Sequence, residues 1–278
     1  MKLVVLKGGD EAVPLAHSTR AGSKVTRASG AVALSGDGQR WVLVNVSPLV
    51  ADQLATDARL LRHQGLPDAA VRAVVLTDAQ VDHVSGLLSL RDGAPIHLYA
   101  TPAVFEELTQ ALPVLPLLQH YCGVHWHVIP VAGEARTAVF RVEGQPALEF
   151  TAVATDGPPP PHAVRPEAPA IGETIAIAVR DLATGQRLFC AHGLSHAGAS
   201  AEAWMQEADC VLFAGVQGVE LGAQRAEGGA ASDWLEGVRA RRKLLMCRPE
   251  GLGGTCDKPE LLAQRGIEYA ADRMEIEL

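Results

Sequence analysis

The sequence lacks several features that define large classes of proteins. Its five cysteines are scattered and include no CxxC pair, which argues against both a disulfide framework and a cysteine zinc site. It has no basic excess: the net charge of −8 makes nucleic acid or an anionic membrane an improbable main partner. No apolar run is long enough to span a bilayer, and the apolar segment at the N-terminus is too short for a signal peptide. We therefore expect a cytoplasmic protein with reduced thiols.

The most informative stretch that is present runs from residue 71 to residue 88. Residues 71–76 have the length and β-branched content of a buried strand, and a polar segment, 77–83, follows directly. Open α/β sheets place their chemistry at such carboxyl ends of strands. Asp82 and His83 are therefore candidates for metal binding or proton transfer. The alternative is that Asp82 caps a helix starting near His83, with His83 packed in the core.

Other polar residues also follow predicted strands. Residues 31–35 and 41–46 are expected to form a hairpin, and Asn45 and Ser47 lie at its end, where they could point into a cleft. A Ser-Pro turn with side chains bonded to backbone is the favoured interpretation there. His192 lies at the end of another predicted strand, where a ligand or acid/base role and a plain rim position are equally compatible with the sequence.

A second pair of histidines lies within one predicted strand. His125 and His127 are two residues apart in the segment 124–131, so both imidazoles are expected on one face of the strand. They could form a two-histidine metal handle. Because no acidic third ligand is near them in the sequence, a solvated strand face is the favoured interpretation.

The segment from residue 76 to residue 91 resembles a known signature. The pattern is similar to His-x-His-x-Asp-His of the metallo-β-lactamase superfamily, with Asp78 and Gln80 at the two leading histidine positions. More narrowly, it resembles the pyrroloquinoline quinone (PQQ) biosynthesis protein B family, PqqB. The proline-rich segment 158–161 and the ending Met-Glu-Ile-Glu-Leu also resemble that family. The resemblance implies an α/β fold, a metallo-β-lactamase-like αββα sandwich of two mixed β-sheets flanked by helices, in a single domain over residues 1–278.

The chain departs from the family pattern at several metal-binding positions. No cysteine occurs before Cys122, so the family's structural N-terminal zinc is expected to be absent; its position corresponds to the region of residues 16–19. Ala214 stands where the family has an aspartate, and no histidine follows His196. Cys247 lies close to the position of the family's C-terminal histidine, and a thiolate there would favour Zn²⁺ or Cu(I).

The resemblance implies a role late in the synthesis of PQQ from a cross-linked Glu–Tyr peptide. The missing ligands favour lost or altered metal chemistry and a binding or partner protein that holds PQQ, its precursor or another protein of the pathway. The alternative is an oxygenase that hydroxylates a tyrosine-derived precursor, with Asp82 and His83 catalytic. Its remodelled metal site would comprise Asp78, Asp82, His83 and His192. The cofactor is then one transition metal (Fe, Cu or Zn) or none. A superfamily hydrolase fits less well, since it needs two complete zinc sites. No nucleic-acid or membrane partner is expected, and an oligomer is compatible with the sequence.

Overall fold

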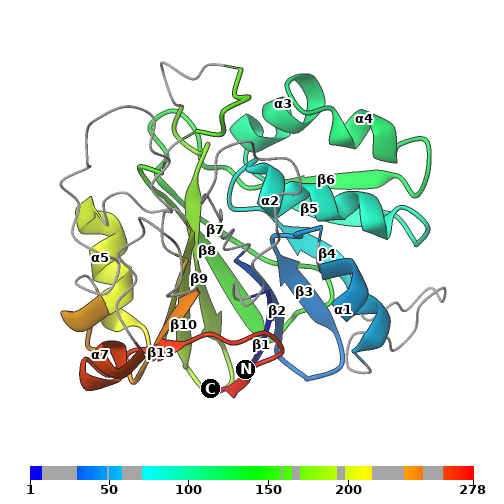
Figure 1. The fold of residues 1–278 in the computed structure, drawn as a ribbon. Coiled ribbons are helices and arrows are strands. Elements are labelled where there is room, and N and C mark those ends of the chain that lie inside the picture. The colour runs from blue at the N-terminus through cyan, green and yellow to red at the C-terminus, as the bar shows by residue number, and fades with distance from the viewer. Residues whose placement is uncertain are drawn as a thin grey trace, which may run out of the picture.

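The computed structural model contains two β-sheets packed face to face, with helices on both outer faces (Figure 1). It describes residues 1–7, 30–48, 50–57, 71–157, 159–164, 170–192, 198–214, 235–246 and 259–278. The metallo-β-lactamase-like αββα sandwich predicted from the sequence is confirmed. The expectations for residues 16–19 and for Cys247 fall outside the described residues.

The first sheet has the strand order β14-β1-β2-β3-β4-β5-β6. The β14-β1-β2-β3 pairs are antiparallel and the β3-β4-β5-β6 pairs are parallel, so the sheet is mixed. Its strands are β1 (Lys2–Lys7), β2 (Ala31–Ser35), β3 (Trp41–Val44), β4 (Val71–Val75), β5 (Ile96–Ala100), β6 (Val124–Val128) and β14 (Glu275–Glu277).

The second sheet has the order β13-β12-β11-β10-β9-β8-β7 and is also mixed. Strands β10 to β13 are parallel, whereas β7 to β10 are joined by antiparallel pairs. Its strands are β7 (Thr137–Phe140), β8 (Leu148–Ala154), β9 (Ile175–Asp181), β10 (Arg187–His192), β11 (Cys210–Ala214), β12 (Arg242–Met246) and β13 (Glu268–Tyr269).

Helices cover the outer face of each sheet, which explains why strands such as β3 and β11 are apolar and buried along their whole length. The first sheet carries α1 (Val50–Thr56), α2 (Val81–Val84), the 3₁₀ helix η1 (Ser85–Leu90), α3 (Pro102–Gln110) and α4 (Val114–Leu118). The second carries α5 (Gly198–Glu207) and α7 (Pro259–Gln264). No helix in the described part of the chain is long and apolar enough to cross a membrane.

Besides the apolar contacts between each sheet and its helices, a cluster of apolar side chains fills the space between the two sheets. Phe150 of β8, Cys190 of β10 and Leu3 of β1 are fully buried in it. Every second residue of a strand faces this core. A polar residue at the end of a strand therefore points between the sheets if it continues the same every-second-residue pattern. His192 follows Leu188 and Cys190 in this alternation. The fold therefore brings strand ends from both halves of the chain to one rim.

Candidate functional site

The ends of β3 and β4 are tied together by side-chain hydrogen bonds. Asn45 adopts a left-handed backbone conformation (φ 60°), which asparagine tolerates better than most residues. Its Oδ1 accepts a bond of 3.0 Å from the Thr77 N–H, and its Nδ2 donates to Thr77 Oγ1 at 2.9 Å. One of the two bonds goes to backbone, as expected for the Asn45 side chain. Its partner, however, is Thr77, just after the end of β4, and not the turn that contains Asn45.

Thr77 extends this network to Asp78 and His83. The Thr77 hydroxyl donates to Asp78 Oδ2 at 2.9 Å, and the Gln80 N–H donates to Asp78 Oδ1 at 2.8 Å. Both carboxylate oxygens also contact His83 Nδ1, at 2.7 and 2.8 Å. With Nδ1 held by Asp78, Nε2 is the nitrogen of His83 that remains for a metal or substrate. From the sequence, Asp78 is a candidate metal ligand. In the structure its carboxylate contacts His83 Nδ1, as the supporting carboxylate does in carboxylate–histidine–metal arrangements.

Each member of the buried Asp78–His83 pair favours the charged form of the other. Burial alone would raise the pKa of Asp78, but the charge and hydrogen bond of His83 outweigh it and lower that pKa. Burial alone would lower the pKa of His83, but Asp78, assisted by the charge of Asp82, raises it. Without a metal, the two side chains form an ion pair.

A short helix and a close backbone contact fix the position of His83. Helix α2 is followed directly by η1, and it docks on the segment after β3 because Val46 N–H donates to the His83 carbonyl at 2.7 Å and Gly86 N–H donates to the Val46 carbonyl at 2.9 Å. A Cβ at Gly86 would lie 2.3 Å from the Ser47 carbonyl oxygen, so only glycine permits this approach.

Asp82 lies half-buried in the first turn of α2. The N-cap of α2 is Gln80, and no side-chain hydrogen bond caps the helix. The alternative in which Asp82 caps the helix is therefore wrong. The companion expectation, that His83 is buried, is correct, but the side chain is hydrogen-bonded to Asp78 within the polar network.

His192 comes from the other half of the chain to lie beside His83. Their ring centroids are 5.4 Å apart in an edge-to-face arrangement. His192 is 1% exposed, and among the described residues only the Gly30 backbone comes close enough to bond one of its ring nitrogens, so at least one ring nitrogen is left without a hydrogen-bond partner. Burial, with the charge of His83 adding to it, lowers the pKa of His192 to about 4. The ring also packs against Gly30, where a Cβ would lie 2.2 Å from His192 Cδ2.

Two residues next to His192 offer little or nothing to a metal. Ala214 of β11 is the Cα partner of His192, and Met246 of β12 is the Cα partner of Ala214, so the three strand ends form one row. Alanine has no donor atom, and a thioether is a soft, weak ligand. The departure from the family pattern at Ala214 therefore falls directly beside the candidate site.

The end of the proline-rich loop also reaches this rim. Ile175 N–H, at the start of β9, donates to the Thr77 carbonyl at 2.9 Å, and Thr101 Oγ1 donates to the Gly172 carbonyl at 2.6 Å. The next strand after the proline-rich segment is β9, which begins at Ile175.

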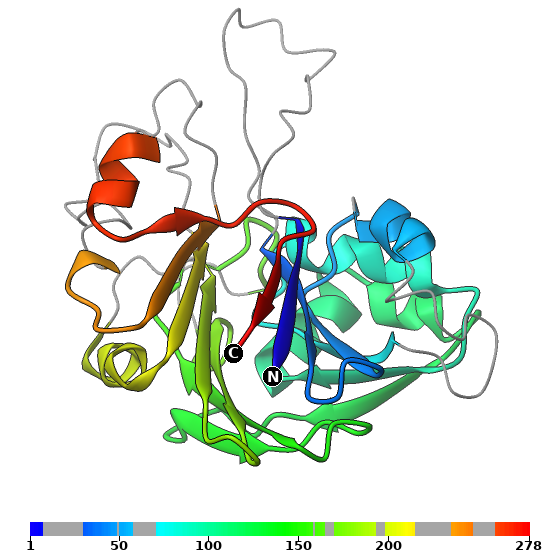
Figure 2. The same ribbon diagram turned by 90° about the horizontal axis from the view of Figure 1, so that it is seen from below.

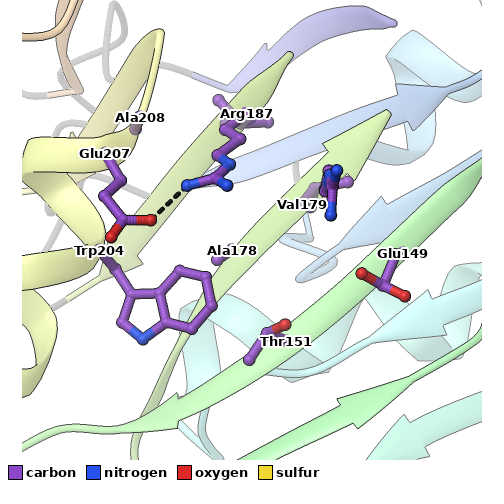
Figure 3. A pocket seen from close by; sticks show the side chains of 10 residues that line it. Glu149, Thr151, Ala178, Val179, Arg187, Trp204, Glu207 and Ala208 are labelled. Atoms are coloured by element: carbon purple, nitrogen blue, oxygen red, sulfur yellow. Dashed lines mark hydrogen bonds and ion pairs between the residues drawn. The ribbon is translucent and has the colours of Figure 1, made fainter. Parts of the chain in front are cut away.

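A pocket of about 130 Å³ lies elsewhere, on the outer face of the second sheet between β8, β9, β10 and α5. Figure 3 shows Arg187 of β10 paired with Glu207 of α5, with Trp204 beside them and Glu149 and Thr151 on β8. Its volume is below the range of about 300–1,000 Å³ typical of small-molecule sites. No histidine or cysteine lines it. We therefore place the candidate site at the rim and not in this pocket.

Comparisons with known proteins agree with the architecture. Residues 40–246 match the model of the β-lactamase superfamily domain. The coenzyme PQQ synthesis protein B of Methylobacillus flagellatus is 34% identical over 90% of this chain and 88% of its own length. That of Azotobacter vinelandii is 32% identical over 94% and 92%.

Solved structures with low sequence identity share the fold. Zn²⁺-bound PqqB from Methylobacterium extorquens matches over the whole of both chains with a TM-score of 0.74 and 21% identity. A diphosphatase of the PhnP family matches over 99% of this chain and 97% of its own with a TM-score of 0.63 and 15% identity. With sequence relatives of this similarity and coverage, the chain belongs to the coenzyme PQQ synthesis protein B family, within the β-lactamase superfamily.

Proposed function

We propose that this protein acts in PQQ synthesis through a remodelled site in which His83 and His192 bind one transition-metal ion. The observation that carries the proposal is the buried His192 side chain, in which at least one ring nitrogen lacks a hydrogen-bond partner in the described part of the chain. A buried polar group without a partner costs about 1–3 kcal/mol, and a bound ion would remove that cost.

The positions of the two imidazoles fit this role. Two imidazoles on one ion, with bonds of about 2.0–2.1 Å at a tetrahedral angle, place their ring centroids about 5 Å apart. The His83 and His192 centroids are 5.4 Å apart. The low pKa of His192 keeps its ring neutral, which is the form that binds metals. Asp82 directly precedes His83 in the sequence, and its carboxylate is our candidate for a third ligand.

The surrounding residues orient the site. Asp78 holds the Nδ1 side of His83, which leaves Nε2 as the nitrogen available to a metal. Thr77, which is itself bonded to Asn45, donates to Asp78. When bound, a redox-active ion with open positions would supply the oxygen chemistry that hydroxylation of an aromatic ring requires. Asp82 and His83 stay our candidates for the residues that contact the substrate or ion directly.

A second candidate function is a binding or partner protein of the same pathway without metal chemistry. Gln80 at a histidine position of the signature favours it, as does Ala214 beside His192. Both functions place the protein in PQQ synthesis, and they differ in whether the rim holds an ion.

Metal analysis distinguishes the two. Protein purified without chelator is analysed for Fe, Cu and Zn, together with the variants His192→Asn and His83→Asn and the control His120→Asn, whose histidine is exposed on the surface beyond α4. We expect the wild type and the control to hold one ion that both site variants lose. An identical metal content in wild type and His192→Asn would contradict the remodelled site and favour the binding protein. Restoration of PQQ production in cells that lack the family protein then tests the pathway role itself.

A further inference from the structure

A second group of metal-ligating side chains lies away from the rim site. His97 of β5, His127 of β6 and Glu143, in the segment between β7 and β8, place their ligand atoms within 4.8 Å of one another. His97 Nδ1 is 3.0 Å from His127 Nε2 and 3.0 Å from Glu143 Oε2. The three residues are 30 and 16 positions apart along the chain, so the fold alone brings them together.

Strand register explains why the two imidazoles meet. In the parallel β5–β6 pair, His97 is opposite His125 and Tyr99 is opposite His127, so these four residues share one face of the sheet. Tyr99 belongs to the core between the sheets, so this is the face directed towards the second sheet. The side chains of His97 and Glu143 are 18% and 69% exposed, so an ion has a path from solvent.

Tyr99 positions two of the three groups. Its ring is stacked on His127, with centroids 4.4 Å apart and planes 10° from parallel. Its hydroxyl oxygen accepts a bond of 2.9 Å from the Glu143 N–H. Glu143 precedes Gly144, whose φ of 81° closes a turn in which the Gln145 N–H donates to the Val142 carbonyl at 3.0 Å. Glu143 is thus held by a tight turn as well as by Tyr99.

Hydrogen bonding alone does not account well for this arrangement. His97 Nδ1 lies equally close to a carboxylate oxygen and to an imidazole nitrogen. One N–H at His97 can satisfy only one of these two acceptors well, whereas a cation would satisfy all three lone pairs together. In a tetrahedral zinc site, bonds of about 2.0–2.1 Å separate the ligand atoms by about 3.3 Å. This is close to the 3.0 Å that separates His97 Nδ1 from each of the other two groups.

We propose that His97, His127 and Glu143 form a site for a divalent first-row transition-metal ion. Two imidazoles and one carboxylate are donors typical of Zn²⁺, Co²⁺, Ni²⁺ and Cu²⁺, and three protein ligands leave one position for water. The ion would join β5 and β6 of the first sheet to the segment that links β7 and β8 of the second. The sequence favours a solvated strand face at His127 because no acidic residue lies near it along the chain. That premise is wrong for the folded chain, where Glu143 supplies the acidic group. His125, which is exposed, fits that preference.

Calorimetric titration with Zn²⁺ tests the site in the full-length protein after removal of bound metal. To separate it from the rim, the titration is made in the wild type and in a His83→Asn/His192→Asn background. We expect one saturable equivalent to remain in that background and to be lost with His127→Asn or Glu143→Gln. The matched control Glu134→Gln, at an exposed glutamate of the same region, should keep it. Tyr99→Phe, which keeps the ring but removes the hydroxyl, should weaken binding about 10-fold.

Two readouts keep the test decisive if the double variant folds poorly. In the otherwise unchanged protein, saturating Zn²⁺ should raise the Tm by about 5 °C, and this shift should shrink in Glu143→Gln but not in Glu134→Gln. The electron paramagnetic resonance spectrum of bound Cu²⁺ should lose a component with two nitrogen ligands in His127→Asn. Equal titration curves for Glu143→Gln and wild type, or no saturable binding outside the rim, would overturn the proposal. Failure of the rim proposal would leave this one untouched, because the two sites share no residue.

Discussion

At the scale of single residues, Asp78 has the most consequential position at the rim. Its contacts with other described residues hold those groups in place: the Asp78 carboxylate accepts hydrogen bonds from Thr77 and Gln80 and contacts His83 Nδ1. A carboxylate that holds one imidazole nitrogen determines which nitrogen is left to bind a metal, and it raises the basicity of the imidazole.

Replacing Asp78 with Asn should therefore weaken metal binding without abolishing it. We expect Asp78→Asn to lower metal affinity at the rim about 10–100-fold, because the amide does not supply the negative charge that balances His83. Affinity is measured by competition with a chromogenic chelator. Asp92→Asn is the control, since Asp92 is an exposed carboxylate beyond η1. An unchanged affinity in Asp78→Asn would show that His83 does not depend on this contact.

His192 should make the metal-free protein sensitive to acid. Its pKa of about 4 in the folded state lies below the ordinary value of 6.5, so between these values the unfolded chain binds the proton that the folded chain does not. Stability contributed by the neutral ring is complete above about pH 6.5 and declines as the pH falls towards 4, by about 3 kcal/mol in total.

The measurement is urea unfolding at pH 7 and pH 4.5 for chelator-treated wild type and His192→Gln. His83 acts in the opposite sense: its raised pKa gives stability below about pH 6.5 that is lost as the pH rises. The difference between wild type and variant isolates His192, and it should shrink at the lower pH. A constant difference would contradict the low pKa.

At the scale of elements, the rim depends on how α2 and η1 dock on the segment after β3. Gly86 permits the closest approach, and the carbonyl of His83 is itself part of the contact. The position of a functional imidazole thus follows from a backbone-to-backbone fit.

Gly86→Ala should break this fit. The added methyl group would lie 2.3 Å from the Ser47 carbonyl oxygen, so the helix must move. We expect a loss of about 2 kcal/mol or more in the free energy of unfolding, together with weaker metal binding at the rim. Gly93→Ala is the matched control, because its nearest neighbour, the Leu90 carbonyl oxygen, would be 3.4 Å away. Urea denaturation of both variants provides the comparison.

The elements themselves could largely be predicted from the sequence. The strand before Thr77, the hairpin of β2 and β3, and α3 with proline in its first turn all follow local rules of pattern and turn chemistry. The resemblance to a family supplied their arrangement in two sheets.

Contacts between distant residues could not be predicted in this way. The sequence singled out His192 by its strand end, but its placement beside His83 depends on the packing of the two sheets. Glu143 lies 16 residues from His127, with β7 between them, so no local pattern connects the two. The role of Asp78 as the partner of His83 is likewise a matter of geometry, since the spacing of five residues suits a ligand and a supporting group equally.

At the scale of the whole molecule, the two sheets share one apolar core, and the last strand helps to close it. Ile276 of β14 is fully buried against this core, while its neighbour Glu277 is exposed. Figure 2 shows β14 beside β1, with the two ends of the chain close together.

Ile276→Ala should lower the free energy of unfolding by about 2–5 kcal/mol, because it leaves a cavity between the sheets. Glu277→Ala, on the solvent side of the same strand, should change it by less than about 0.5 kcal/mol. Equilibrium unfolding in urea measures both. Similar effects of the two substitutions would show that β14 contributes only through its backbone.

The pairing of β1 with β14 has a consequence for biosynthesis. Lys2, Leu3 and Val4 are matched with Glu277, Ile276 and Glu275, and the Leu278 N–H donates to the Met1 carbonyl. One edge of β1 therefore stays uncovered until β14 has been synthesised, and until then the growing chain carries an open strand edge on which aberrant pairing can start.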